Sequence, residues 1–252
     1  MQTQQEKQDL IIGRNAVTEV LKSDRTVDTL YILRGEKNPA ITRLASICRE
    51  RGGVVKEADR RKLDTLCGGA NHQGVAAFVA AHEYATLQDI LEYARQKGEA
   101  PFVIVCDELE DPHNLGAIIR TAEAAGAHGV VIPKRRSASL SFAVGKTSAG
   151  ALEYMRVARV ANLPSALDTL KAEGCWVYGA DMDGENYRQT DFSGAVALVV
   201  GSEGKGIGRL VRDKCDFIVS LPMRGKINSL NASVAAGILM YEISAQRDGA
   251  QK

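Results

Sequence analysis

Short, uninterrupted apolar segments recur through residues 81–252, and stretches with helical periodicity separate them. The segments that we expect to be strands are residues 102–106, 129–132, 176–180, 196–200 and 217–220. A strand in which nearly every residue is apolar is buried on both faces, which is typical of a parallel sheet with helices on both sides. We therefore predict an α/β domain, built on a parallel sheet, over residues 81–252.

Residues 1–80 show the same alternation on a smaller scale. We expect strands at residues 30–33 and 74–80 and a further strand beginning at Val54, with helices over residues 41–48 and 63–66. A segment of about 75 residues is long enough to fold as a small domain. The predicted domains are thus residues 1–80 and residues 81–252, joined by a short link.

The charge of the chain is nearly balanced, with 32 Lys and Arg against 31 Asp and Glu. No strong overall field draws it onto nucleic acid. Residues 1–80 carry a formal charge of +3 and residues 81–252 carry −2, which weakly favours the first domain as the one that faces nucleic acid. A basic cluster, Lys134–Arg136, is either a solvated loop or a contact for RNA phosphates.

The five cysteines are scattered and form no CxxC pair. This spacing argues against a metal site or a disulfide framework and fits a reducing compartment. Residues 1–8 lack the apolar core of a signal peptide, and no apolar run approaches the roughly 20 residues of a membrane helix. We expect a cytoplasmic protein that binds neither a membrane nor a metal.

Three segments place polar residues or glycines where an apolar strand ends, and ligands bind at that edge of a parallel sheet. In the first, Asp111 and Pro112 are typical of a helix start. Asn114 and Arg120 are six residues apart, about 600° around a helix, so they do not share a face. They could meet on one ligand if Asn114 lies in the first turn and Arg120 reaches round. The alternative is a capped surface helix with a solvated arginine.

The second segment, residues 199–207, holds three glycines after a buried strand. Glycine permits positive φ and a close approach of the backbone to a ligand. The segment is not a phosphate P-loop, because Lys205 is not followed by Ser or Thr, and it does not contain GxGxxG. Glu203 has no partner that the sequence reveals. A plain structural turn is the alternative.

The third segment, residues 221–235, predicts a strand end, a polar loop and a helix capped by Ser229 or Asn231. The helix is crowded with Ala, Ser and Gly, so something packs close to its backbone. Tight packing against the sheet or against a second subunit is the alternative to a ligand site.

Taken together and in this order, the three segments resemble the motifs of the SPOUT class of RNA methyltransferases. They are most similar to the TrmH/RlmB family of ribose 2′-O-methyltransferases. The stretches that carry the resemblance are DPHNLGAIIRTAEAAGA from Asp111, VVGSEGKGI from Val199 and LPMRGKINSLNASVAAGI from Leu221. Two more, IIGRNAVTEVLKS from Ile11 and NHQGVAA from Asn71, resemble the family's RNA-binding extension. The resemblance therefore covers nearly the whole chain.

The resemblance implies a methyltransferase that uses S-adenosyl-L-methionine, with a deep trefoil knot in its C-terminal domain and a homodimer formed through that domain. It places the cofactor against the backbone at Gly201, Leu221 and Leu230, with Met223 as an apolar neighbour. The residues that match the family's catalytic positions are Asn114, Arg120, Glu203 and Asn231. No metal is implied.

The expected reaction is 2′-O-methylation of a ribose in structured RNA, and the large-subunit branch of the family implies a guanosine of 23S rRNA. A tRNA substrate is the alternative within the class. Two other classes stay open: a catalytically silent RNA-binding or ribosome-assembly factor, and a nucleotide-dependent oxidoreductase. The intact motif residues weigh against the first, and the absence of GxGxxG weighs against the second. Arg14 and the cluster Arg60–Lys62 make the N-terminal domain the expected reader of RNA.

Overall fold

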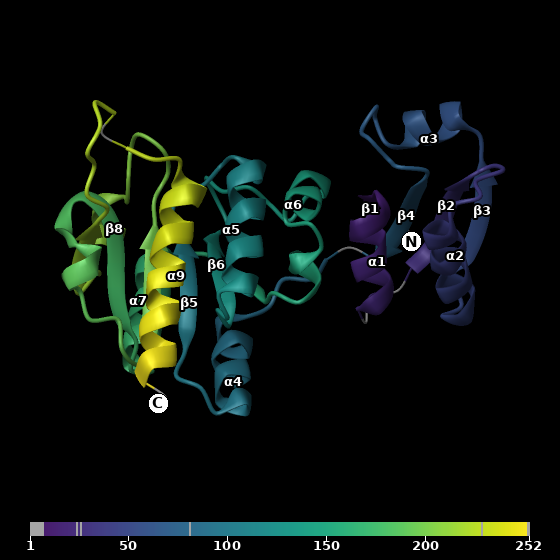
Figure 1. Cartoon of the computed structure of the whole chain (residues 1–252). Helices are drawn as coiled ribbons and strands as arrows, with labels where there is room; N and C mark the ends of the chain where they lie inside the picture. The colour runs from purple at the N-terminus through teal and green to yellow at the C-terminus, as the bar shows by residue number, and fades with distance from the viewer. Residues whose placement is uncertain (1–7, 24, 26, 81, 228, 251–252) are drawn as a thin grey trace, which may run out of the picture. The chain divides into compact units, whose positions relative to one another are not determined.

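The structure is a computed structural model that describes residues 8–23, 25, 27–80, 82–227 and 229–250. Its contacts divide the chain into two compact units (Figure 1). The first unit comprises Met1–Glu83 together with Leu140–Tyr154, and the second comprises Tyr84–Ser139 together with Met155–Lys252. Residues 140–154 lie inside the segment that the sequence assigns to the C-terminal domain, yet their contacts group them with the N-terminal unit.

The second unit is built on one six-stranded sheet in the order β10-β8-β9-β5-β6-β7, and every pair of adjacent strands in it is parallel. The strands are β5 (Phe102–Cys106), β6 (Gly129–Pro133), β7 (Val157–Val160), β8 (Trp176–Asn186), β9 (Val196–Val200) and β10 (Phe217–Ser220). Every residue of β5 and β9 is buried, as their apolar composition predicts. The α/β prediction is confirmed. The sequence missed β7, a four-residue edge strand interrupted by the exposed Arg159.

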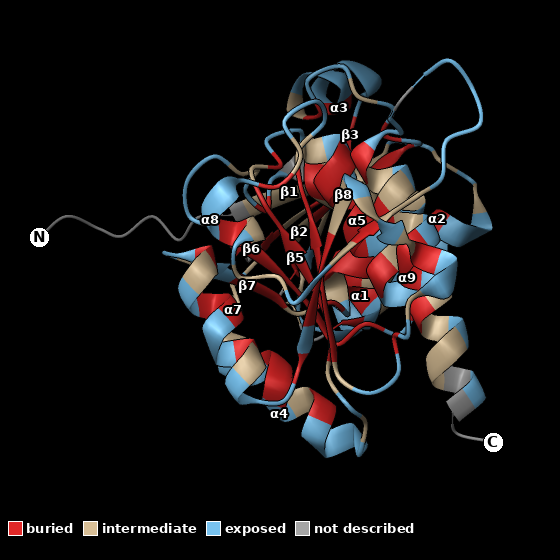
Figure 2. Cartoon of the chain, turned by 90° about the vertical axis from the view of Figure 1, so that its left-hand side faces the viewer, coloured by how far each residue is buried: buried red, intermediate tan, exposed pale blue. Residues whose placement is uncertain are grey.

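Helices cover both faces of this sheet, with α4 and α7 on one side and α5 and α9 on the other (Figure 2). The helices are α4 (Leu87–Lys97), α5 (Pro112–Ala124), α7 (Leu163–Ala172), the short α8 (Arg209–Arg212) and α9 (Ala232–Ala250). Helix α5 begins where the sequence predicts, because the Asp111 side chain accepts a hydrogen bond from the His113 amide at 2.9 Å. Helices α5 and α9 pack against each other.

The first unit holds a four-stranded sheet in the order β1-β4-β2-β3, in which only β2 and β3 are parallel. Its elements are β1 (Gln8–Ile12), α1 (Arg14–Lys22), β2 (Val27–Leu33), α2 (Pro39–Glu50), β3 (Val54–Ala58), α3 (Arg60–Leu66), β4 (Val75–Ala80), α6 (Phe142–Thr147) and the 3₁₀ helix η1 (Ala151–Glu153). Arg25 donates to Glu153 at 2.7 Å and to Asp9 at 2.9 Å, which ties η1 to this unit. The basic cluster Arg60–Lys62 forms the exposed first turn of α3.

Among the described helices, none is both long and apolar enough to cross a membrane. The trefoil knot stays a prediction.

Candidate active site

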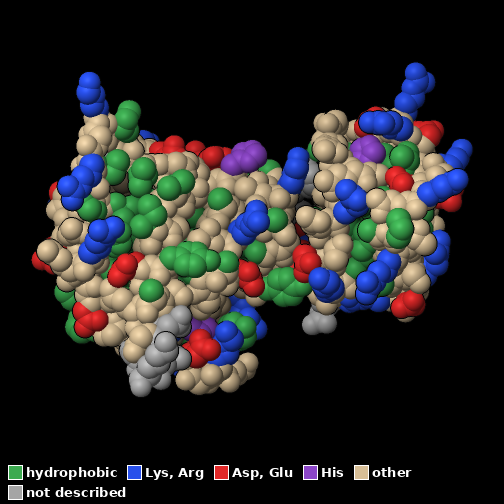
Figure 3. Space-filling view, in the orientation of Figure 1, with side chains coloured by type: hydrophobic (Ala, Val, Ile, Leu, Met, Phe, Trp, Pro, Cys, Tyr) green, Lys and Arg blue, Asp and Glu red, His purple; other side chains and the backbone are tan. Residues whose placement is uncertain are grey.

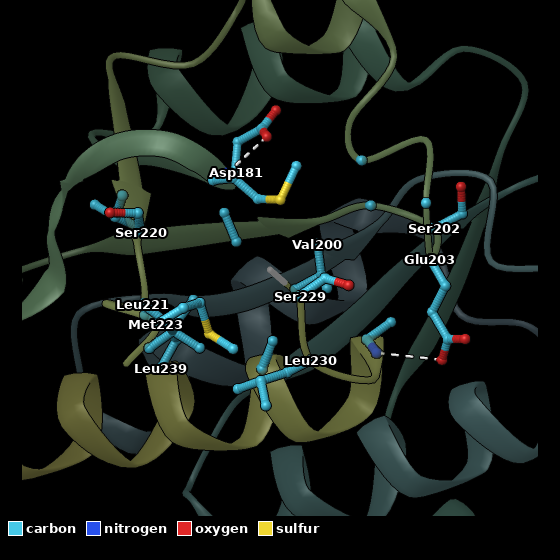
Figure 4. A pocket seen from close by; sticks show the side chains of 18 of the residues that line it. Asp181, Val200, Ser202, Glu203, Ser220, Leu221, Met223, Ser229, Leu230 and Leu239 are labelled. Atoms are coloured by element: carbon cyan, nitrogen blue, oxygen red, sulfur yellow. Dashed lines mark hydrogen bonds between the residues drawn. The ribbon is translucent and has the colours of Figure 1, made fainter. Parts of the chain in front are cut away.

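The middle of β8 and the carboxyl ends of β9 and β10 border a cavity of about 580 Å³ (Figure 4). Its walls come from residues 180–182 of β8, residues 200–206 after β9, residues 219–223 at the end of β10, and the start of α9. The pairing of β8 with β10 is irregular here, since Ile218 pairs with Gly179 while the next residue pairs with Glu185. Strand β8 therefore bulges relative to β10, and the bulge contributes part of the wall.

All four residues predicted to bind the cofactor line this cavity: Gly201, Leu221, Met223 and Leu230. Leu221, Met223 and Leu230 lie close to Leu239, and these side chains form the apolar side of the cavity (Figure 4). Met223 and Leu230 are 39% and 38% exposed, so the chain itself does not cover them. An apolar wall left open in this way suits a planar or aliphatic ligand group.

The loop after β9 closes on itself and makes the opposite wall. Ser202 and Gly206 exchange two backbone hydrogen bonds of 3.0 and 3.2 Å, and Gly204 has φ of +79°. A Cβ on Gly201 would lie 2.1 Å from the carbonyl carbon of Gly206. Gly201 is therefore required by the loop's own backbone. This differs from the reason expected from the sequence, which was close approach by the cofactor.

Glu203 projects from that loop and joins two helices. Its Oε1 accepts hydrogen bonds from Asn114 Nδ2 at 3.1 Å, from Asn231 Nδ2, and from the amide of Ala232 at 3.4 Å. Asn231 Nδ2 also lies 2.9 Å from Asn114 Oδ1. The carboxylate thus lies at the N-terminal turns of α5 and α9, where helix dipoles favour negative charge. The structure brings three of the four predicted catalytic residues into one hydrogen-bonded group.

Asn231 also caps α9. Its Oδ1 accepts from the amides of Ser233 and Val234 at 3.0 and 3.2 Å, so Asn231, and not Ser229, is the cap that the sequence left undecided. The cap fixes the side-chain amide with its oxygen toward the helix and its nitrogen toward Glu203. Capping and site geometry therefore depend on the same side chain.

Arg120 does not join this group. It is exposed on α5 and makes no hydrogen bond or ion pair with any residue in the described part of the chain. Its position follows from the helix, since six residues turn the chain by about 600° and leave Arg120 on another side from the buried Asn114. The role assigned to Arg120 stays a prediction.

Asp107 is a residue of this edge that the sequence reasoning missed. It directly follows β5, is 5% exposed, and accepts a hydrogen bond from the amide of Gly208 at 2.8 Å. Burial raises the pKa of its carboxyl group, and the Gly208 bond opposes this effect. Asp107 thereby ties the end of β5 to the chain just beyond the Glu203 loop. The sequence signal that could have identified Asp107 is its position as a polar residue directly after a fully apolar strand.

Two family models match the chain in the regions that these motifs occupy. The model described as the SpoU rRNA Methylase family matches residues 101–241, more than half of the chain. The chain belongs to the SpoU methylase family. A second model, described as RNA 2′-O ribose methyltransferase substrate binding, matches residues 10–85. This SpoU methylase is therefore an RNA methyltransferase, and the resemblance inferred from its motifs is confirmed.

Relatives of this SpoU methylase align along nearly the whole chain. YacO of Bacillus subtilis (strain 168), whose name assigns it to the TrmH family of tRNA/rRNA methyltransferases, is 50% identical over 244 residues, covering 96% of this chain and 98% of YacO. The AdoMet-bound rRNA methyltransferase from Sinorhizobium meliloti is 27% identical with a TM-score of 0.80, covering 94% of this chain and 87% of that one.

A tRNA-modifying member of the same class aligns over less of the chain. The TrmH/SpoU tRNA modifying enzyme of A. aeolicus is 26% identical with a TM-score of 0.54, and the match covers 66% of this chain and 86% of that one.

Proposed function

We propose that this SpoU methylase transfers a methyl group from S-adenosyl-L-methionine to the 2′-hydroxyl of a ribose in structured RNA, with a guanosine of 23S rRNA as the preferred target. The observation that carries the proposal is the hydrogen-bonded group of Asn114, Glu203 and Asn231 beside an apolar cavity. The match of residues 10–85 to a substrate-binding model for ribose 2′-O-methyltransferases supports the choice of the ribose as acceptor.

The cavity suits S-adenosyl-L-methionine in size and lining. Small-molecule sites commonly enclose about 300–1,000 Å³ and combine an apolar wall with a few polar groups. Leu221, Met223 and Leu230 offer apolar contact, and the loop after β9 offers backbone polar groups at Gly201 and its neighbours. The AdoMet-bound relative from S. meliloti supports this assignment. When bound, the cofactor supplies a methyl group activated for transfer to a nucleophile.

The protein's part in the reaction is to position the ribose and to stabilise the negative charge that develops on its oxygen. Holding two reactants in a near-attack geometry removes several kcal/mol of an entropic barrier. Asn114 and Asn231 orient the ribose, and Glu203 holds both amides in place. Arg120 binds the target phosphate and stabilises the negative charge that develops on the ribose oxygen. Because a guanidinium stays charged, a phosphate oxygen is the favoured proton acceptor, with a transiently deprotonated Arg120 as the alternative.

Coverage of the chain favours rRNA over tRNA as the substrate. The rRNA methyltransferase from S. meliloti aligns with 94% of this chain, whereas the tRNA-modifying enzyme of A. aeolicus aligns with 66%. We infer that the N-terminal unit accounts for this difference in coverage, because its contacts set it apart as a separate unit and a substrate-binding model matches residues 10–85. We assign RNA recognition to residues 1–80 and methyl transfer to residues 81–252.

A homodimer and a cytoplasmic location complete the proposal. Val234, Ile238 and Tyr241 form an apolar stripe on α9 at helical spacing and are 49%, 38% and 55% exposed. A second copy of the chain is the occupant we assign to this stripe. The five cysteines are free thiols, which suits a reducing compartment.

Labelled S-adenosyl-L-methionine, incubated with unmodified 23S rRNA and tRNA transcripts, tests the proposed function. We expect label on 23S rRNA, and mapping should place it on a ribose whose replacement by deoxyribose abolishes transfer. Label on tRNA alone would support the alternative substrate. Tight RNA binding without transfer to any transcript would support a silent assembly factor.

A further inference from the structure

Three exposed cations lie on the two loops that supply walls of the cavity, and they form no ion pair with a carboxylate in the described part of the chain: Lys205, Arg224 and Lys226. Lys205 lines the cavity from the loop after β9. Arg224 and Lys226 lie on residues 222–227, which continue from the cavity wall at the end of β10. All three side chains are exposed. They follow the ends of β9 and β10, two strands whose loops line the same cavity.

Several cations elsewhere in this unit are paired with carboxylates. Arg212 pairs with Asp183 at 2.9 Å and with Asp181, and Lys171 pairs with Asp216 at 2.7 Å. The carboxylates at the cavity are already engaged, since Asp181 is held by Arg212 and Glu203 by the two asparagines. Neither carboxylate forms an ion pair with Lys205, Arg224 or Lys226, so these three cations can bind an anionic ligand, although residues 81–252 as a whole carry a formal charge of −2.

Residues 222–227 also expose apolar surface. Ile227 is 71% exposed beside Lys226, and Met223 is 39% exposed beside Arg224. Figure 3 shows Lys and Arg side chains interspersed with apolar ones on the face of this unit. Unstacked RNA offers matching chemistry, because phosphates accept charge-assisted hydrogen bonds and base faces make apolar contacts.

We propose that Lys205, Arg224 and Lys226 clamp the phosphates that flank the target ribose and hold that stretch of RNA over the cavity. The inference rests on the proposed function, since it takes RNA as the substrate and the cavity as the cofactor site. The clamp contributes RNA affinity at the reacting centre, separate from recognition by the N-terminal unit. Because it contacts phosphates, it carries no base information.

The test compares the full-length enzyme with a triple variant, Lys205→Gln, Arg224→Gln and Lys226→Gln. The probes are a 20-nucleotide single-stranded oligouridylate and an unmodified 23S rRNA transcript, with binding measured across a salt series. For single strands each phosphate contact contributes about 0.7 to the slope of log affinity against log salt, so loss of three contacts should flatten the slope by about 2. Affinity for the oligouridylate should fall at least about tenfold at low salt.

A matched control removes three cations at the opposite edge of the sheet: Arg95→Gln, Lys97→Gln and Lys171→Gln. These side chains lie near the C-terminal ends of α4 and α7, just before β5 and β8 begin. The control changes the net charge equally, so it should keep the wild-type salt slope if the clamp is local. A charge-preserving variant, Lys205→Arg, Arg224→Lys and Lys226→Arg, should also keep it.

The outcomes separate this inference from the proposed function. Unchanged RNA affinity in the triple variant, or an equal loss in the control, would overturn the clamp. Loss of S-adenosyl-L-methionine affinity equal to the loss of RNA affinity would also overturn it, because the three cations would then act on the cofactor site. If the wild-type enzyme methylates neither 23S rRNA nor tRNA, the proposed function fails, while the oligouridylate measurement still decides whether the cations bind phosphates.

Discussion

Asn231 Nδ2 lies 2.9 Å from Asn114 Oδ1, which links the first turns of two helices whose residues are 117 positions apart in the sequence. The contact depends on the cap of α9, because the other end of the Asn231 side chain accepts hydrogen bonds from that helix. Glu203 completes the link from the loop after β9. Helix capping, helix packing and the candidate active site therefore share one small set of polar atoms.

Replacing Asn231 should separate its two roles. Asn231→Ala removes the cap and should destabilise the protein by about 1 kcal/mol, together with a large loss of methyl transfer. Asn231→Asp keeps an oxygen for the cap but loses the amide donor and places a second carboxylate beside Glu203. We expect Asn231→Asp to melt above the alanine variant and still to lose transfer. Thermal denaturation measures the stability of each variant, and single-turnover assays measure its methyl transfer. Full activity in Asn231→Asp would contradict the orienting role.

Gly201→Val should abolish binding of S-adenosyl-L-methionine without unfolding the sheet. Its Cβ would collide with the backbone of Gly206 and displace the loop that forms one wall of the cavity. Gly194→Ala is a matched control, since Gly194 has a φ of +81° and open space around its Cα. The control should lose about 1 kcal/mol of stability and keep its affinity. Calorimetric titration checks this, and undiminished binding by Gly201→Val would place the cofactor elsewhere.

The stability of the protein should fall between pH 7.5 and pH 5, in part because of His82. Burial lowers the pKa of His82 from 6.5 to about 4, with a further lowering by Arg25 that Asp9 opposes. Its buried Nδ1 has no hydrogen-bond partner among the described residues. Below pH 6.5, His82 binds a proton in the unfolded chain, whereas in the folded chain it stays neutral until the pH falls to about 4. This difference in proton binding lowers the free energy of unfolding at pH 5 by about 2 kcal/mol relative to pH 7.5.

The variant His82→Asn isolates this contribution. It should lose about 2 kcal/mol less than the wild type when the pH is lowered from 7.5 to 5, as measured by denaturant titration at each pH. His128, whose pKa burial also lowers, responds equally in both proteins and cancels in the difference. Parallel pH profiles for the two proteins would show that His82 is not the responsible group.

Ile238→Glu should convert the proposed dimer into a monomer. The substitution places a charge in the centre of the apolar stripe on α9, where it would be buried without a partner in the dimer. Ile238 is 38% exposed in the single chain, so the fold itself should tolerate the change. Sedimentation at micromolar concentration measures the outcome, with Lys97→Glu as a surface control. A monomeric wild-type protein, or a variant that sediments as a dimer, would exclude this interface.

The sequence predicted the central strands and the grouping of the motifs well, because buried parallel strands are apolar throughout and the chemistry follows directly after them. Strands β5 and β9 and the start of α5 lie where the patterns place them. The strand β7 and the grouping of residues 140–154 could not be predicted, since a short edge strand and a tertiary contact leave no periodic signal. The reason for Gly201 also required coordinates, because the clashing atoms belong to Gly206, five residues further along the chain.

In the proposed function, this SpoU methylase performs ribose methylation with Arg120 acting on the RNA and not on the cofactor. Single-turnover methyl transfer to an unmodified 23S rRNA transcript, measured for Arg120→Ala alongside its calorimetric affinity for S-adenosyl-L-methionine, tests this most directly. Arg120 is exposed and makes no hydrogen bond or ion pair with the described residues that its loss would break. We predict that transfer falls by about a hundredfold to a thousandfold, on the scale of other groups that stabilise developing negative charge, with cofactor affinity within about twofold of wild type. Transfer at the wild-type rate, or an equal loss of cofactor affinity, would contradict the account.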